Sequence, residues 1–180
     1  MNGLRTAFLS TISLLSAGYL CLAAPQKDGT TPPQYPMEVL FAPTGGIKPK
    51  LADLIQKARS SIVIAAHNIF LPDITLSLVG AKFRGVDIRI VLDDFGPTIE
   101  KSDFPLFQRN GIPLLMIGGL SQQGAMNHSF AIFDRKVLAV GSYRWTELGE
   151  NEDYSSMLFT QDPEAVKTYL GKFEQLWKGE

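Results

Sequence analysis

The sequence predicts an α/β fold in which a mixed central β-sheet has helices on both faces. From residue 37 onward, apolar runs of strand length alternate with segments whose apolar residues recur at helical spacing. Most of the strand runs are apolar at nearly every position, as expected when helices cover both faces of a sheet. Residues 37–180 are enough to bury such a core without disulfide bonds.

The first half of this region has the order β-α-β-α-β. Its expected elements are a strand, a helix, a strand, a helix and a strand at residues 39–42, 49–59, 62–66, 72–84 and 86–92. Gly85 ends the second helix and lets the chain turn directly into the next strand. The sequence Asp-Asp-Phe-Gly-Pro at 93–97 then predicts a loop.

The second half predicts a short helix, four strands and a closing helix. Asn110 and Gly111 end the short helix, and a tight turn at Asp134-Arg135-Lys136 joins two strands as a hairpin. Asp162 is the expected N-cap of the last helix, with Pro163 in its first turn. The helices are expected at 104–109 and 163–177, and the strands at 113–117, 130–133, 137–140 and 156–160.

The first two dozen residues predict a secretory signal peptide at 1–24. One positive charge precedes a mostly apolar run, and two alanines stand before a proline-rich stretch. Residues 25–36 are polar and proline-rich, which predicts an extended linker before a domain at 37–180. A cleaved signal implies a secreted or periplasmic protein, whereas an uncleaved one would anchor the protein to a membrane through residues 6–24.

Cysteine and charge limit the remaining choices. Cys21, the only cysteine, would be the lipidated residue of a lipoprotein signal, but the bulky Leu20 before it disfavours this alternative. A chain cleaved after residue 24 has no disulfide framework. The net charge of −1 argues against strong nonspecific binding of nucleic acid. The basic residues at 48, 50, 57 and 59 are accordingly interpreted as a solvated helix face.

The most informative stretch is Met-Asn-His-Ser-Phe-Ala-Ile-Phe-Asp at 126–134, followed by Gly-Ser-Tyr-Arg at 141–144. Its spacing resembles the HKD motif of the phospholipase D superfamily, H-x-K-x4-D followed by G-S-x-N. The apolar filling and the Trp-Thr pair at 145–146 match as well. Segments at 61–64, 72–74, 84–89 and 110–113 resemble the small single-motif branch, which includes Nuc-type endonucleases and mitochondrial cardiolipin hydrolase.

The resemblance implies a phosphodiesterase that needs neither metal nor cofactor. In the family the motif His attacks phosphorus, the Lys, Ser and Asn hold the phosphate oxygens, and a downstream Glu orients the imidazole. At the motif positions Asn127, Ser129 and Arg144 replace the His, the Lys and the Asn, whereas the family residues are retained at Asp134, Ser142 and Glu152.

The two replacements at 127 and 129 predict that hydrolysis is lost or strongly reduced. An amide is not a useful nucleophile at phosphorus, and a hydroxyl lacks the fixed charge of an ammonium group. Loss of a nucleophile costs on the order of a millionfold in rate. Ser129, Ser142 and Arg144 are still expected to bind a phosphate group, with Arg144 as a bidentate donor. The alternative for Arg144 is a surface ion pair with Glu147 or Glu152.

Two histidines could restore activity in a rearranged site. His128 is next to the motif position, but neighbouring residues of a strand face opposite ways, which favours packing on the back of the strand. His67 ends a strand near the same pocket mouth and could instead be a polar rim residue. Asp93 and Asp94 could suggest a metal site, but adjacent carboxylates point apart and a solvated loop is favoured.

Three functions follow as hypotheses. The first is a protein that binds phosphate, as phospholipid or nucleic acid, with little or no hydrolysis. The second is an active phosphodiesterase that uses His67 or His128. The third is a non-catalytic subunit completed by an active paralogue. The single motif implies a homodimer, because in this branch two chains bring their motifs together across a two-fold axis.

Overall fold

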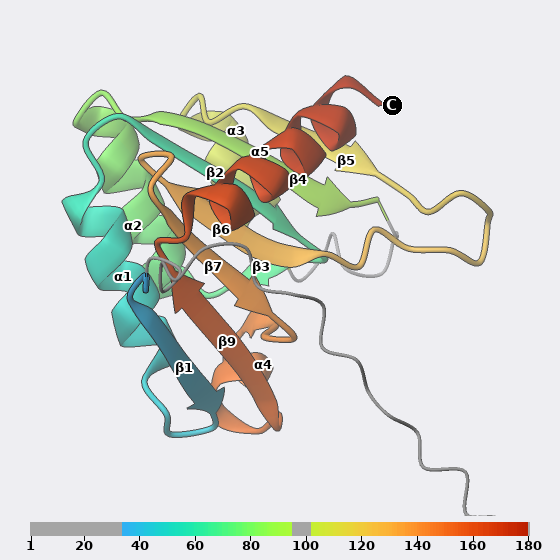
Figure 1. The fold of residues 1–180 in the computed structure, drawn as a ribbon. Helices are drawn as coiled ribbons and strands as arrows, with labels where there is room; N and C mark the ends of the chain where they lie inside the picture. The colour runs from blue at the N-terminus through green and yellow to red at the C-terminus, as the bar shows by residue number, and fades with distance from the viewer. Residues whose placement is uncertain (1–33, 95–101, 180) are drawn as a thin grey trace, which may run out of the picture. The chain divides into compact units, whose positions relative to one another are not determined.

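A computed structural model of the protein describes residues 34–94 and 102–179 and confirms the predicted fold class (Figure 1). The main sheet has seven strands, which are β1 (Met37–Ala42), β2 (Ser61–Ala66), β4 (Asp87–Asp93), β5 (Leu114–Ile117), β6 (Ser129–Phe133), β7 (Val137–Gly141) and β9 (Ser155–Thr160). The helices are α1 (Ile47–Lys57), α2 (Pro72–Phe83), α3 (Phe104–Arg109), α4 (Glu147–Asn151) and α5 (Pro163–Lys178).

The order of the strands across the sheet is β1-β9-β7-β6-β2-β4-β5. Strands β2, β4 and β5 are parallel to one another, whereas β6 is antiparallel to both β2 and β7. The start of β6 therefore lies beside the C-terminal ends of β2 and β7. Residues 127–129 meet the segments that follow those two strands at this end of the sheet.

Each face of the sheet has its own hydrophobic core. Figure 1 shows α5 across one face, with α1 and α2 on the other. On β6, Phe130 and Ile132 pack in the cluster that includes Phe173 of α5, while Ala131 and Phe133 belong to the cluster of α1 and α2. This alternation places Ser129 on the face of α1 and α2, and His128, directly before the strand, packs against Phe130 on the α5 face.

Local signals in the sequence explain where several elements end. The Asp162 carboxylate accepts the N–H of Glu164 at 3.0 Å and caps α5, as expected from sequence. Gly85 follows α2 with a φ of 87°, and Gly111 follows α3 with a φ of 63°. Such left-handed conformations favour glycine after a helix.

The turn between β6 and β7 is tight, as predicted. Asp134 and Arg135 both have positive φ, 52° and 56°, which is the conformation of a two-residue hairpin turn. The Asp134 carboxylate accepts N–H groups of Arg59, Ser60 and Ser61 at 2.7–3.1 Å. Burial alone would raise the pKa of Asp134, but these hydrogen bonds lower it below its ordinary value. The carboxylate thereby ties the hairpin to the turn before β2.

Three short elements were not expected from the sequence. Strands β3 (Ile69–Phe70) and β8 (Trp145–Thr146) form a separate parallel pair, and α4 follows β8 directly. The pair joins the segment after β2 to the segment after β7 at the end of the sheet where β6 begins.

Within the described residues, none of the helices has the length and apolar content to cross a bilayer. The signal peptide expected at 1–24, most of the linker at 25–36 and part of the loop at 93–97 lie outside the described residues.

Candidate functional site

A pocket of about 370 Å³ opens where β6 begins and β2 and β7 end. It brings together six of the residues singled out from the sequence. Its lining is His67, Asn68, Asn127, His128, Ser129, Gly141, Ser142, Tyr143, Arg144, Trp145 and Thr146. Gly141 is needed for this geometry, because a Cβ there would lie 2.0 Å from the carbonyl oxygen of Ser156.

Ser129 uses its hydroxyl inside the protein. Its Oγ donates to the carbonyl oxygen of Tyr143 at 2.6 Å and accepts the indole N–H of Trp145 at 3.2 Å. A serine hydroxyl has one proton to donate. While these hydrogen bonds persist, Ser129 cannot donate to a phosphate oxygen. The expected contribution of Ser129 to anion binding therefore does not fit this geometry.

Ser142 uses its hydroxyl oxygen as a hydrogen-bond acceptor. Its exposed Oγ accepts the backbone N–H of Ser156 at 3.2 Å, and the backbone N–H of Ser142 donates to the carbonyl oxygen of Ser156 at 3.0 Å. These two bonds fix the position of Ser142 at the pocket and leave its hydroxyl proton available to an anion.

Arg144 pairs with Asp153 rather than with Glu147 or Glu152, the partners considered from the sequence. Its Nε and Nη2 donate to the two carboxylate oxygens at 2.6 and 2.8 Å. The hydrogen bonds from Arg144 lower the pKa of Asp153, so this carboxylate stays charged. Arg144 also lines the pocket, and its remaining N–H donors are not used by Asp153.

Two residues at motif positions lie away from the pocket. Asp134 is at the opposite end of β6 from Asn127, in the hairpin turn. Glu152 is exposed at the C-terminal end of α4 and is not part of the pocket lining. A different acid, Glu150, accepts the hydroxyl of the buried Tyr143 at 2.8 Å. Burial and this hydrogen bond raise the pKa of Tyr143.

His67 lies against a buried carboxylate that sequence reasoning had assigned to a solvated loop. Its Nδ1 is buried without a hydrogen bond, 3.8 Å from Oδ1 of Asp93. Asp93 is 2% exposed and also accepts the backbone N–H of Met126, directly before Asn127. The parallel pairing of β2 and β4 brings their ends together. The sequence offered a signal for this contact. His67 follows the strand expected at 62–66 and Asp93 follows the strand expected at 86–92, and parallel neighbouring strands end on the same side of a sheet.

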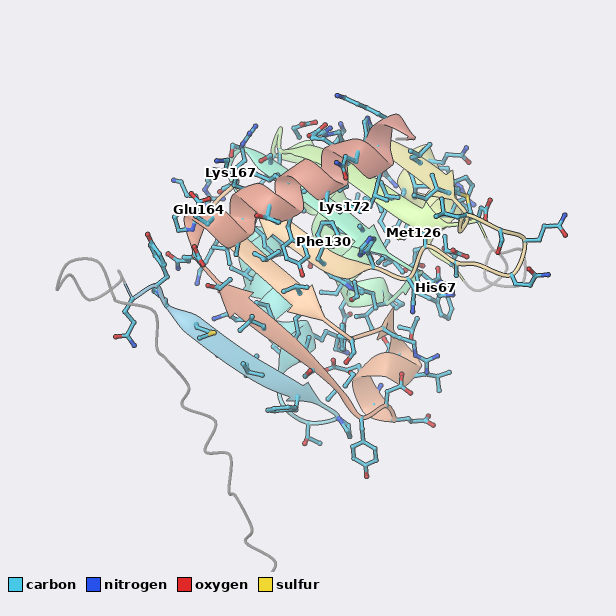
Figure 2. The ribbon with its side chains drawn as sticks, turned by 45° about the vertical axis from the view of Figure 1, so that its right-hand side comes forward. His67, Met126, Phe130, Glu164, Lys167 and Lys172 are labelled. Carbon is cyan, nitrogen blue, oxygen red and sulfur yellow. The ribbon has the colours of Figure 1, made fainter. Side chains whose placement is uncertain are left out.

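His128 occupies the other face of β6, as strand alternation predicts. Its ring packs edge-on against Phe130 with a centroid distance of 5.7 Å. Burial and the positive charge of Lys172 lower the pKa of His128. The residue borders the pocket and also two hollows on the α5 side. Figure 2 labels the surrounding Phe130 and Lys172.

Comparison with known proteins identifies the family. Residues 51–177 match the family described as "Cardiolipin synthase, PLD-like domain". The chain therefore belongs to the phospholipase D-like family. Residues 127–129 of the motif-like stretch lie at the pocket, where β6 begins.

Curated relatives carry phospholipid-related names. The chain is 30% identical to mouse mitochondrial cardiolipin hydrolase over 129 residues, which are 72% of this chain and 57% of that protein. It is 28% identical to a Rickettsia felis phospholipase D over 130 residues, 72% of this chain and 64% of that protein. The matched region thus spans less than two thirds of either relative.

Solved structures show the same fold over nearly their whole length. The phospholipase D family member Nuc from Salmonella typhimurium superimposes with a TM-score of 0.72 at 26% identity, covering 81% of this chain and 95% of that one. NucT from Helicobacter pylori gives a TM-score of 0.73 at 20% identity, covering 81% and 97%. The second likeness concerns the fold alone.

Proposed function

We propose that the protein binds a phosphate or phosphodiester group in this pocket and hydrolyses it slowly or not at all. The observation that carries the proposal is the inward hydrogen bonding of Ser129, at the position where the family motif has its cationic donor. Asn127, at the position of the attacking imidazole, is exposed at the pocket but is not a nucleophile for phosphorus. Loss of the nucleophile alone lowers a rate by about a millionfold.

Two side chains support binding without hydrolysis. Ser142 donates its hydroxyl proton to the anion, and Arg144 contributes its charge and its free N–H groups. The Arg144–Asp153 pair is partly exposed, with side chains 56% and 29% accessible. Exposed ion pairs contribute about 1 kcal/mol or less, so an anion displaces Asp153 from the guanidinium at small cost.

Calorimetric titration tests the binding. Inorganic phosphate and bis-p-nitrophenyl phosphate are titrated into the purified protein, and p-nitrophenol release is followed in parallel. Millimolar or tighter binding without turnover is expected. Ser142→Ala weakens binding, while Ser77→Ala on α2, outside the pocket lining, leaves it unchanged. Absence of binding at millimolar ligand contradicts the proposal.

A second candidate is hydrolysis that uses His67. The observation that favours it is the buried Asp93 carboxylate facing Nδ1, because an acid behind one ring nitrogen orients the other toward a substrate. In this mechanism Nε2 of His67 attacks phosphorus and breaks the bond to one ester oxygen, so the alcohol leaves and takes a proton from water. A second water then attacks phosphorus, breaks the P–N bond and frees both the imidazole and the phosphate monoester. Turnover that disappears in His67→Ala and persists in His128→Ala supports it. Turnover insensitive to His67→Ala, or no turnover at all, rejects it.

Assembly and location are part of the proposal. One motif per chain favours a homodimer with two pockets facing one another, or pairing with an active paralogue. Light scattering on the purified protein gives the mass in solution, and a monomer at micromolar concentration contradicts the homodimer.

We also propose secretion or periplasmic export. N-terminal sequencing of the protein from the producing cell distinguishes cleavage near residue 24 from retention of an anchor.

A further inference from the structure

A second hollow lies beside the pocket, on the α5 side of the sheet. Its volume is about 590 Å³, and it shares Asn127 and His128 with the first pocket. The two cavities are therefore neighbours across the start of β6. Figure 2 shows Lys172 on α5 and Met126 at the entry to β6, which both line this hollow.

The walls of this hollow are mostly apolar. Ile117, Leu120, Met126 and Leu176 line it together with glycines and an alanine. Leu120 is fully exposed to solvent. The backbones of Gly119 and Gly124 approach closely across the 118–125 loop. A Cβ at residue 119 would lie 2.3 Å from the backbone of Gly124, so only glycine fits there. A turn closed by the Gly124 N–H and the Ser121 carbonyl oxygen at 3.0 Å ends the loop, and Leu120 is exposed beside this turn.

One cation stands at the polar end of the hollow. Among the residues that the structure describes, Lys172 has no carboxylate within ion-pair distance, and its charge contributes to the lowered pKa of His128. Glu164, Lys167 and Tyr169 line a separate third hollow, which shares His128 and Lys172 with this one. An anion bound between the two groups would offset the effect of the ammonium and favour the protonated imidazole.

The geometry points to a subsite for an anionic amphiphile, whose acidic group lies between His128 and Lys172 and whose hydrocarbon part covers Ile117, Leu120 and Leu176. This goes beyond the proposed function, because the acidic group binds outside the part of the first pocket formed by Ser142 and Arg144, and the ligand is an amphiphilic phosphate ester. A single-stranded nucleic acid is recognised by a basic groove with aromatic stacking platforms. The described lining of this hollow has one cation and no Phe, Tyr or Trp.

Dihexanoyl phosphatidic acid, kept below its micellar concentration, tests the subsite by calorimetry and proton NMR. The chain has two histidines, so His67→Ala assigns both ring signals. Saturation is expected to raise the pKa of His128, because a bound anion favours the protonated imidazole. Lys172→Gln is expected to weaken affinity roughly tenfold, the effect of losing one charged hydrogen bond. Lys82→Gln is the control, because Lys82 is in the last turn of α2 and outside the lining of these hollows, and the change leaves affinity unchanged.

Leu120→Ser separates the two parts of the ligand. It is expected to weaken binding of the dihexanoyl ester and to leave binding of inorganic phosphate unchanged. Thermal melting checks that each variant is folded. Equal affinity of wild type and Lys172→Gln overturns the inference, as does binding that leaves the pKa of His128 unchanged. Tighter, Lys172-dependent binding of oligothymidylate than of the ester also overturns it.

Ser142→Ala and Arg144→Gln distinguish this inference from the proposed function. If these variants lose phosphate binding while Lys172→Gln retains full affinity for the ester, the subsite is wrong and the first pocket stands. If the ester depends on Lys172 while Ser142→Ala and Arg144→Gln bind phosphate as the wild type does, the first pocket is wrong and the subsite stands.

Discussion

The two ends of β6 differ in what the motif positions do. At one end the Asp134 carboxylate accepts three backbone N–H groups and the hydroxyl of Ser60. At the other end Asn127 is exposed at the pocket and Ser129 is hydrogen bonded to the protein interior. The carboxylate at one end therefore holds the hairpin in place, whereas at the other end Asn127 and Ser129 are the replacements on which the proposed loss of hydrolysis rests.

The largest expected effect comes from restoring the chemical end. Asn127→His combined with Ser129→Lys supplies an imidazole and an ammonium at the pocket, and we expect hydrolysis of bis-p-nitrophenyl phosphate to rise roughly a thousandfold or more. Initial rates of nitrophenol release measure it. The single variant Asn127→His is the control and is expected to gain less. A folded double variant with the wild-type rate would show that the scaffold lacks more than these two groups.

Ser129→Ala tests whether the pocket end of β6 has become structural. The change leaves the indole N–H of the buried Trp145 without its partner, and we expect a loss of about 1–3 kcal/mol in the free energy of unfolding. Urea denaturation measures the loss. Phosphate affinity, by calorimetry, is expected to stay unchanged. Full stability combined with lost phosphate binding would reverse the assignment of Ser129.

Asp134→Ala tests the hairpin end of β6, where the motif aspartate is retained. Its hydrogen bonds lie near the surface, where water can replace some of them, so we expect a loss of about 1–2 kcal/mol in the free energy of unfolding. Asp53→Ala is the matched control, because that carboxylate pairs with Lys57 on the exposed surface of α1 and contributes under about 0.5 kcal/mol. Equal losses in the two variants would contradict a special role for Asp134.

The smallest effect is a pH dependence at the same carboxylate. The pKa of Asp134 is lower in the folded protein than its ordinary value, so its stabilisation is complete above the unfolded pKa near 4. It is lost as pH falls through the folded pKa, where the carboxylate gains a proton. The difference in unfolding free energy between wild type and Asp134→Asn should therefore shrink below about pH 4. Urea denaturation at pH 7 and pH 3 measures it.

Local sequence signals were enough for most of the fold. The α3 helix at 104–109, the 134–136 turn and the Asp162 cap agree with the sequence. Each depends on residues that are close in sequence. A proline stands in the first turn of α3, and the Asp162 carboxylate accepts the N–H of Glu164, two residues further on. The β3–β8 pair was missed because its two-residue strands have no period of their own and depend on a partner far along the chain.

The candidate site was predictable where backbone direction decided it. Alternation along β6 placed His128 on the face opposite to Ser129. The partners of side chains were less accessible to sequence reasoning. Arg144 pairs with Asp153, and Asp93 faces His67, because the path of the chain through α4 and the pairing of β2 with β4 set these distances. The same path leaves Glu152 exposed and outside the pocket lining.

Trp145, which lines the pocket and donates its indole N–H to Ser129, can report on the pocket through its fluorescence. Trp145 is one of two tryptophans in the chain, and its side chain is buried while its N–H is bonded to the Ser129 hydroxyl. The other, Trp177, stacks on Phe173 in the opposite core. In a protein with Trp177→Phe, emission from Trp145 would follow movement at the start of β6 without any label.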